Sequence, residues 1–174
     1  MTSSVYRSLI LLFETDPLAR RLDQLRRSVR EEYGGGSALT LPVHMTLFKW
    51  RSALLDPSLS DFLSEVPTEV PVQLGRLTLS IRHHAIWFAA NSKGLPDLLR
   101  RTKAMLNACS ISNLHTPTYP HMTVAYRDYP PETLKRIYQR ILSADIPLHA
   151  FLQCSGLALA ATDMNGIWHL QKRV

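Results

Sequence analysis

The sequence predicts an α+β fold in which two similar lobes, each an antiparallel sheet with flanking helices, enclose a central cleft. Three observations lead to this prediction. Segments with strand-like and helix-like patterns of apolar residues follow one another along the chain. Part of that order occurs twice in the same register. Identical tripeptides, His44-Met45-Thr46 and His121-Met122-Thr123, occupy matching places in the two copies. We expect residues 1–174 to form a single domain of two interleaved lobes.

The composition is that of a folded, basic protein. Hydrophobic residues make up 45% of the 174 residues, and the formal net charge is +6. A basic balance favours anionic partners such as phosphate esters or RNA, although a generic basic surface has the same charge. Cys109 and Cys154 form no Cys-x-x-Cys motif, which fits two buried thiols in a reducing compartment. The sequence lacks a signal-peptide pattern and any run of membrane-spanning length, so we expect a cytoplasmic protein without membrane contact.

The first part of the chain has the pattern of a strand, a helix and a second strand. Val5–Phe13 is apolar and predicts a buried strand. Asp16 and Pro17 provide a helix cap and a first-turn proline. Apolar residues then recur at helical spacing up to the glycine run at Gly34–Gly36, which predicts an amphipathic helix. Leu41–Trp50 is predicted as the next strand.

The middle of the chain predicts a short helix and a hairpin. Asp56-Pro57 opens a helix that continues to Val66. Val70–Ile81 alternates apolar and polar residues, as a half-buried strand does. Arg82-His83-His84 then forms a turn, and Ala85–Ala90 is the second strand of the hairpin.

Two more helices and three strands complete the prediction. They are a helix over Leu95–Ile111, a strand over His121–Arg127, a helix over Pro131–Leu142 and a hairpin of Pro147–Ala161 with Gly166–Gln171. Both helices show apolar stripes at helical spacing. The hairpin is indicated by Asn165-Gly166, a strong turn signal.

An internal repeat relates the two halves of the chain. His44 and His121 lie 77 residues apart, and the same offset carries Leu9–Leu11 onto Ile86–Phe88. It also carries three apolar residues of the first helix onto three of the third. Strand, helix and His-Met-Thr strand therefore occur twice in register. Two lobes related by a pseudo-twofold axis place the motifs face to face across a cleft, which is a favoured ligand site. The repeat could be retained architecture without present use, but identical tripeptides in both halves argue against this.

The repeated residues suit phosphodiester chemistry. Because side chains alternate along a strand, His44 and Thr46 share one face, and so do His121 and Thr123. Hydrolysis needs a base for water and an acid for the leaving oxygen, and histidine titrates near neutrality. The threonine hydroxyls can donate to the non-bridging phosphate oxygens. These four residues are the predicted catalytic set, and the chemistry needs no metal or other cofactor. As a hypothesis, His121 activates the water and His44 protonates the leaving oxygen.

The paired motifs, their spacing and the duplicated lobes resemble the 2H phosphoesterase superfamily, which includes 2′-5′ RNA ligase-like proteins and cyclic phosphodiesterases. The resemblance covers nearly the whole chain. The hydrophobic residue that ends each motif in that superfamily is matched by Leu47 and Val124. The resemblance implies a bilobal α+β fold with the motifs facing across a groove. It also implies action on 2′,3′-cyclic phosphates, 2′-5′ linkages or related RNA ends.

Supporting residues are predicted from strand parity. Phe48 and Trp50 share the face of His44 and could stack a base of the substrate, or they could serve in packing. Arg127 shares the face of His121 and could clamp a phosphate, or it could be a rim arginine. Lys49 and Tyr126 fall on the opposite faces, where a solvated lysine and a core tyrosine are expected.

The sequence leaves several functions open. We expect a hydrolase acting on nucleotides or RNA with a 2′,3′-cyclic phosphate or 2′-5′ linkage. An RNA-binding module without turnover and a 2′-5′ RNA ligase are alternatives, the latter because ring opening can run in reverse. No metal site is expected, since neither His-Glu-x-x-His nor clustered carboxylates occur. Among the other histidines, His115 precedes a proline-rich loop and could approach the cleft. We expect a monomer.

Overall fold

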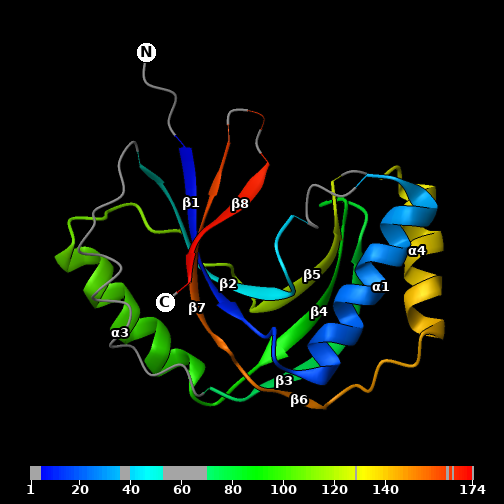
Figure 1. Cartoon of the computed structure of the whole chain (residues 1–174), viewed down its shortest axis with the longest axis horizontal. Helices are drawn as coiled ribbons and strands as arrows, with labels where there is room; N and C mark the ends of the chain where they lie inside the picture. Colours follow the sequence, from blue (N-terminus) through cyan, green and yellow to red (C-terminus); the bar gives the residue numbers. More distant parts are fainter. Residues whose placement is uncertain are drawn as a thin grey trace.

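Two antiparallel sheets form the framework of the molecule (Figure 1). The computed structural model describes residues 5–35, 40–52, 70–127, 129–163, 165 and 167–173. The first sheet contains β2 (His44–Ser52), β1 (Val5–Leu12), β7 (Gly156–Thr162) and β8 (Trp168–Arg173), in that order. The second contains β5 (His121–Tyr126), β4 (Ala85–Asn91), β3 (Val72–Ser80) and β6 (Phe151–Leu152). The predicted α+β class with two antiparallel sheets is confirmed. The helix predicted over Asp56–Val66 lies outside the described residues.

Three helices flank the sheets in the described part of the chain. Helices α1 (Pro17–Tyr33) and α4 (Pro131–Ser143) contact each other and pack against strands of the second sheet. Helix α3 (Leu95–Ala108) lies on the opposite side of the molecule (Figure 1). Helix α1 ends where Gly34 adopts a left-handed φ of 72°, which glycine tolerates without strain. None of the helices in the described ranges is both long and apolar enough to cross a membrane.

The two sheets have matching strand orders. β1, α1 and β2 follow one another in the chain as β4, α3 and β5 do, and in each sheet the His-Met-Thr strand is at the edge beside the strand that precedes the helix. The third position is filled by β7 in the first sheet and by β3 in the second. The sequence repeat therefore corresponds to a repeat in the topology.

The prediction of one continuous strand over Pro147–Ala161 is wrong. Its first part forms β6 and pairs with β3 of the second sheet, whereas its last part forms β7 and pairs with β1 of the first. Residues 153–155 connect the two strands. Gly156 has a φ of 152°, which other residues rarely adopt, where the chain enters β7. A single segment thus crosses from one sheet to the other.

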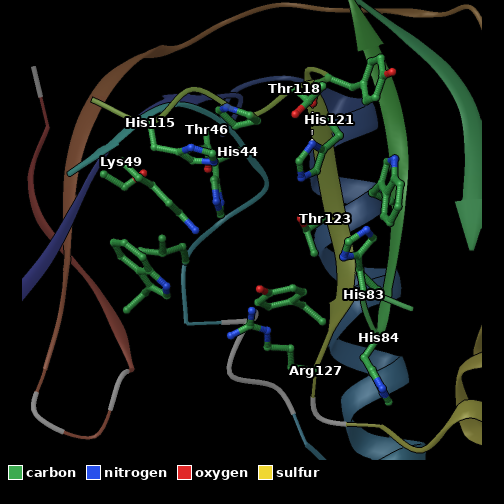
Figure 2. A pocket seen from close by; sticks show the side chains of 18 of the residues that line it. His44, Thr46, Lys49, His83, His84, His115, Thr118, His121, Thr123 and Arg127 are labelled. Atoms are coloured by element: carbon green, nitrogen blue, oxygen red, sulfur yellow. Dashed lines mark hydrogen bonds between the residues drawn. The ribbon is translucent and has the colours of Figure 1, made fainter. Parts of the chain in front are cut away.

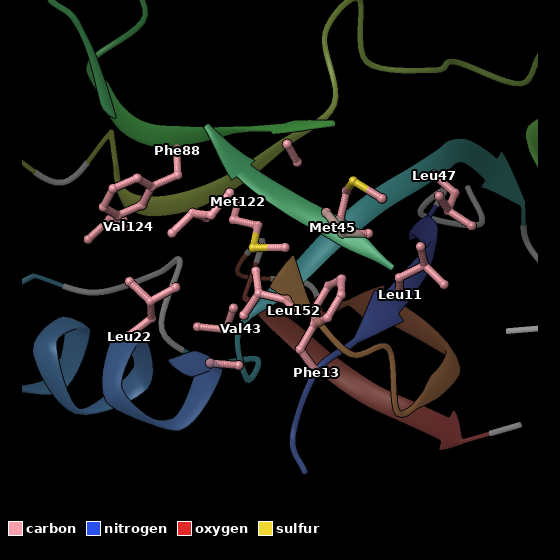
Figure 3. Packing of buried hydrophobic residues seen from close by; sticks show 14 of the residues in the cluster. Leu11, Phe13, Leu22, Val43, Met45, Leu47, Phe88, Met122, Val124 and Leu152 are labelled. Atoms are coloured by element: carbon pink, nitrogen blue, oxygen red, sulfur yellow. The ribbon is translucent and has the colours of Figure 1, made fainter. Parts of the chain in front are cut away.

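One hydrophobic core supports both motifs. Met45 and Leu47 of β2 and Met122 and Val124 of β5 are at most 3% exposed. They belong to a single cluster that includes residues of both sheets and of all three described helices. Figure 3 shows these four residues with part of that cluster, including Leu22 of α1. None of these four side chains lines the cleft, so they face the interior of the molecule. Both motif strands are therefore positioned by the same packed interior.

Each motif strand contains one extra residue directly after its threonine. In β2, the neighbours of Leu47 pair with consecutive residues of β1, so Leu47 itself has no partner. In β5, Val124 is extra in the same way opposite β4. One inserted residue reverses the alternation of side chains beyond it. The two bulges occur at equivalent places, 77 residues apart.

Candidate active site

A cleft of about 870 Å³ contains both His-Met-Thr motifs. His44 and Thr46 reach it from β2, and His121 and Thr123 reach it from β5. The two strands contact each other. Figure 2 shows the two His-Thr pairs on opposite walls of the pocket. The structure thus brings together the four residues that the sequence predicts as the catalytic set.

Equivalent hydrogen bonds orient the two imidazoles. Nδ1 of His44 lies 2.8 Å from the carbonyl oxygen of Pro42, and Nδ1 of His121 lies 2.7 Å from that of Tyr119. A carbonyl oxygen only accepts, so each Nδ1 must carry the proton. Each Nε2 is then the nitrogen left for chemistry, as an acceptor when the ring is neutral and a donor when it is charged. Both rings are therefore held in a tautomer that suits proton transfer.

The surroundings of His44 favour its neutral form. Burial of the ring lowers the pKa of His44 to about 4, and the positive charge of Arg26 acts in the same direction. The hydrogen bond to Pro42 opposes these effects, and the charge of Lys49 adds a smaller lowering. At neutral pH, His44 is consequently a neutral imidazole whose Nε2 carries a lone pair.

Helix α1 holds the backbone just before His44. The buried Arg26 forms an ion pair of 2.8 Å with Asp23, one turn earlier on the helix. Both carboxylate oxygens of Asp23 also accept from the backbone N–H of Val43, each at 3.1 Å. Arg26 faces the interior, as its helical spacing from Leu22 and Val29, both of them buried, indicates.

Phe48 and Trp50 serve in packing, the second of the two roles considered for them, and do not stack a substrate base. Both are buried in the core, at 1% and 3% exposure. The bulge at Leu47 is the physical reason, because it turns them to the core face of β2. The same bulge turns Lys49 into the cleft, which corrects its predicted off-face position. Nζ of Lys49 lies 5.1 Å from the ring centroid of Trp168.

The bulge in β5 has the same effect on the opposite wall. Ala125 is buried, and Tyr126, predicted to be in the core, lines the cleft. Arg127 also lines the cleft, but it lies just beyond β5 with a left-handed φ of 59°. Its backbone N–H donates to the carbonyl oxygen of His84 at 2.6 Å, and its guanidinium carbon lies 4.8 Å from the ring centroid of Tyr126. The substrate-binding role of Arg127 stays a prediction.

Contacts with β2 and with His121 position two further residues of the cleft. His115 exchanges two backbone hydrogen bonds of 2.8 Å with Lys49, which ties its loop to β2 and places His115 at the cleft. Trp87 of β4 packs against His121 with ring centroids 5.7 Å apart. Sequence reasoning did not single out Trp87, whose place in the cleft follows from the pairing of β4 with β5.

The described lining of the cleft is cationic. It contains five histidines, Lys49, Arg82 and Arg127, and none of its described residues is acidic. In the part of the chain that the structure describes, no group of three or more His, Cys, Asp or Glu residues is placed to hold a metal ion. The lining therefore favours an anionic ligand.

Facing His-x-Thr strands between two equivalent sheets define the class of 2H phosphoesterase folds. The family model of the 2′-5′ RNA ligase superfamily matches residues 15–165. The chain belongs to this superfamily, and the resemblance inferred from its motifs is confirmed.

Solved structures of low sequence identity share the fold. E. coli LigT in complex with 3′-AMP is 14% identical, with a TM-score of 0.58 over 99% of this chain and 98% of that chain. LigT in complex with NADP+ is 15% identical, with a TM-score of 0.54 over 99% and 98%. The protein TT0787 of Thermus thermophilus is 17% identical, with a TM-score of 0.54 over 98% and 96%. No match is found among curated protein sequences.

Proposed function

We propose that this chain is a metal-independent phosphodiesterase that hydrolyses 2′,3′-cyclic phosphate or 2′-5′ phosphodiester bonds of nucleotides or RNA ends. The observation that carries the proposal is the facing arrangement of two His-Thr pairs whose Nδ1 atoms are both engaged by backbone carbonyls. The cationic lining supports an anionic substrate. The complex of E. coli LigT with 3′-AMP supports a nucleotide.

In this proposal the scissile phosphate lies between the two motifs. The hydroxyls of Thr46 and Thr123 donate to its non-bridging oxygens and stabilise the charge that develops there. Nε2 of one histidine takes a proton from water as the water oxygen bonds to phosphorus. Nε2–H of the other gives a proton to the ribose oxygen as its bond to phosphorus breaks. One histidine gains a proton and the other loses one. The two Nε2 atoms therefore share one proton after the turnover, as they did before it.

We retain His121 as the base and His44 as the acid. The low pKa of His44 describes the empty cleft, where burial and nearby positive charge disfavour the imidazolium. A phosphodiester bound beside His44 brings a negative charge, which favours the protonated ring. The acid role of His44 therefore depends on the charge of the substrate itself.

The test is hydrolysis of nucleoside 2′,3′-cyclic phosphates in the presence of EDTA. We expect the wild-type protein to be active, and His44→Ala and His121→Ala each to lower kcat/KM by about 10²–10⁴-fold, as general acid–base groups do. His169→Ala is the matched control, since this exposed histidine pairs with Asp163 and does not line the cleft. It should retain activity.

Two results would contradict the proposal. Salt-sensitive RNA binding without turnover of any cyclic or 2′-5′ substrate would favour the RNA-binding module, which the cationic lining also suits. Joined oligonucleotides formed from cyclic phosphate ends, with no hydrolysis product, would favour the ligase. Both outcomes can be read from the same reaction by separating mononucleotide, oligonucleotide and joined products.

A further inference from the structure

Two cations face the cleft beyond the His-Thr pairs. Lys49 follows Thr46 by three residues on one wall, and Arg127 follows Thr123 by four residues on the other. Neither forms an ion pair with a carboxylate of the described residues, and the described lining around them contains no acid. Burial lowers the pKa of Lys49, and the positive charge of Arg127 lowers it further, so the two groups influence each other.

Specific backbone features place both cations. Lys49 points into the cleft because of the bulge at Leu47, and the backbone bonds to His115 hold it there. Arg127 has a left-handed φ of 59°, which a residue with a long side chain seldom adopts. Its guanidinium also packs over the ring of Tyr126. The two positive charges repel each other, and an anion bound between them offsets that repulsion.

The position of these cations indicates a group next to the scissile phosphate. The two histidines and two threonines already provide partners for that phosphate. A strand advances about 3.3 Å per residue, so the backbones of Lys49 and Arg127 lie up to about 10 and 13 Å from those of the threonines. Figure 2 shows Lys49 beside His44 and Thr46 on one wall and Arg127 beyond Thr123 on the other. An anion held by both cations therefore lies beside the scissile phosphate rather than in its place.

We propose that Lys49 and Arg127 bind a second phosphate of the substrate, the 5′-phosphate of the ribose whose 2′,3′-cyclic or 2′-5′ phosphate is cleaved. The inference rests on the proposed function and narrows its substrate class. On a ribose, the 5′ position carries the nearest phosphate to the one at the 2′ or 3′ position. The preferred substrate is then a 5′-phosphorylated nucleotide or an RNA end, rather than a nucleoside that carries the cyclic phosphate alone.

The first experiment measures binding by calorimetry, which does not need turnover. Adenosine 3′,5′-bisphosphate should bind the wild-type protein about tenfold or more tightly than adenosine 3′-monophosphate, because charged hydrogen bonds to the second phosphate are added. Arg127→Gln and Lys49→Gln should each remove most of this advantage. Arg76→Gln is the matched control, since Arg76 is exposed and does not line the cleft. It should keep the advantage.

The second experiment compares hydrolysis of adenosine 2′,3′-cyclic phosphate with and without a 5′-phosphate. The 5′-phosphorylated compound should have a kcat/KM about tenfold or more higher, and the ratio should fall toward one in the Arg127 and Lys49 variants. Circular dichroism confirms that each variant is folded, and the two variants test the site independently.

The outcomes separate the two proposals. Equal binding of the mono- and bisphosphate to the wild-type protein overturns the second site, even if both cyclic compounds are hydrolysed. An advantage that survives in both cleft variants, or that is lost equally in Arg76→Gln, also overturns it. If the bisphosphate binds more tightly through Lys49 and Arg127 but neither cyclic compound is hydrolysed, the second site stands and the proposed hydrolysis fails.

Discussion

His44 and its Nδ1 bond illustrate how single residues prepare the cleft. The carbonyl oxygen of Pro42 fixes the proton on Nδ1, while burial and the charge of Arg26 keep the ring neutral. The two effects act on different properties, the tautomer and the charge. Together they specify one protonation state of the empty site, which is open to direct measurement.

Nitrogen-detected or long-range ¹H–¹⁵N NMR of His44 should show that state. We expect the Nδ1–H tautomer and a pKa of about 4 in the free protein. Because the folded value lies below the ordinary value of about 6.5, the ring stays neutral between these pH values and gains its proton only in more acidic solution. Inorganic phosphate should raise the pKa, since the anion stabilises the imidazolium.

The same spectra contain the opposing results. An Nε2–H tautomer for His44 would refute the role of Pro42. A pKa near 6.5 without phosphate would show that the ring is not desolvated, and a pKa unmoved by saturating phosphate would remove the support for His44 as the acid. The signal of exposed His169 serves as the internal reference for nonspecific salt effects.

Within the motif strands, parity placed side chains correctly only up to each bulge; Arg127 lines the cleft from beyond the end of β5. His44, Thr46, His121 and Thr123 precede the extra residues, so their shared faces followed from alternation alone. Beyond the bulges, parity assigned Phe48 and Trp50 to the cleft and Lys49 and Tyr126 away from it, and the structure reverses all four. Leu47 and Val124 are ordinary strand residues whose side chains give no indication of an insertion. The bulges become evident only when the partner strands are known.

At the scale of elements, the start of helix α1 is tied to the segment that crosses between the sheets. One carboxylate oxygen of Asp16 accepts from the backbone N–H groups of Leu18 and Ala19, which caps the helix. The other accepts from the backbone N–H of Gln153 at 2.9 Å. Asp16 is itself buried. One side chain therefore joins the start of the helix to the β6–β7 connection.

Two substitutions of Asp16 separate these contacts. Asp16→Asn keeps a capping oxygen but has no second acceptor for Gln153, so we expect a loss of about 1 kcal/mol in the free energy of unfolding. Asp16→Ala removes both, and we expect a loss of about 2–3 kcal/mol. Urea unfolding followed by circular dichroism measures both values.

Asp97→Ala is the matched control for the Asp16 variants. This aspartate is in the first turn of α3, but it is exposed, and among the described residues its ion pairs are with exposed Arg100 and Arg101. Its removal should change the free energy of unfolding by less than about 1 kcal/mol. If Asp16→Ala and Asp97→Ala lowered the free energy of unfolding equally, the contact of Asp16 with the β6–β7 connection would not stabilise the protein.

Helices were easier to predict than the C-terminal strands. α1 and α4 begin at prolines and have regular apolar stripes, so their limits differ little from prediction. The segment over Pro147–Ala161 is also apolar, and a run of apolar residues does not show which sheet each part joins. The division into β6 and β7 is defined by pairing with β3 and with β1, and these tertiary contacts are not visible in the apolar pattern.

For the whole molecule, the main feature is that the halves share their strands and their interior. The C-terminal segment supplies β6 to one sheet and β7 to the other. The core cluster runs through both sheets. The repeat predicted two sheets and facing motifs, because it covers strand, helix and motif strand. The repeat could not predict that one segment contributes β6 to one sheet and β7 to the other, because these strands lie where the two halves of the chain resemble each other least.

This sharing predicts one cooperative unfolding transition. Trp50 is in β2 of the first sheet and Trp87 is in β4 of the second, so variants that retain only one of these tryptophans report on the two sheets separately. In each variant the other two tryptophans are replaced by phenylalanine. The urea midpoint measured by tryptophan fluorescence should then equal the midpoint measured by circular dichroism of the same variant. A fluorescence midpoint that differs from the circular dichroism midpoint would show that one sheet unfolds alone.

The twin bulges have a last consequence. Lys49 and Tyr126 are 77 residues apart and each follows its bulge by two residues, so a shared backbone geometry presents a cation on one wall and a phenol on the other. A phosphate between two identical His-Thr pairs would otherwise meet the same surroundings after a half-turn. Because Lys49 and Tyr126 differ, the two orientations of a phosphodiester in the cleft are no longer equivalent. A bound chain then has a defined direction, and the two ends of a ribose become distinguishable to a site whose chemistry is nearly symmetric.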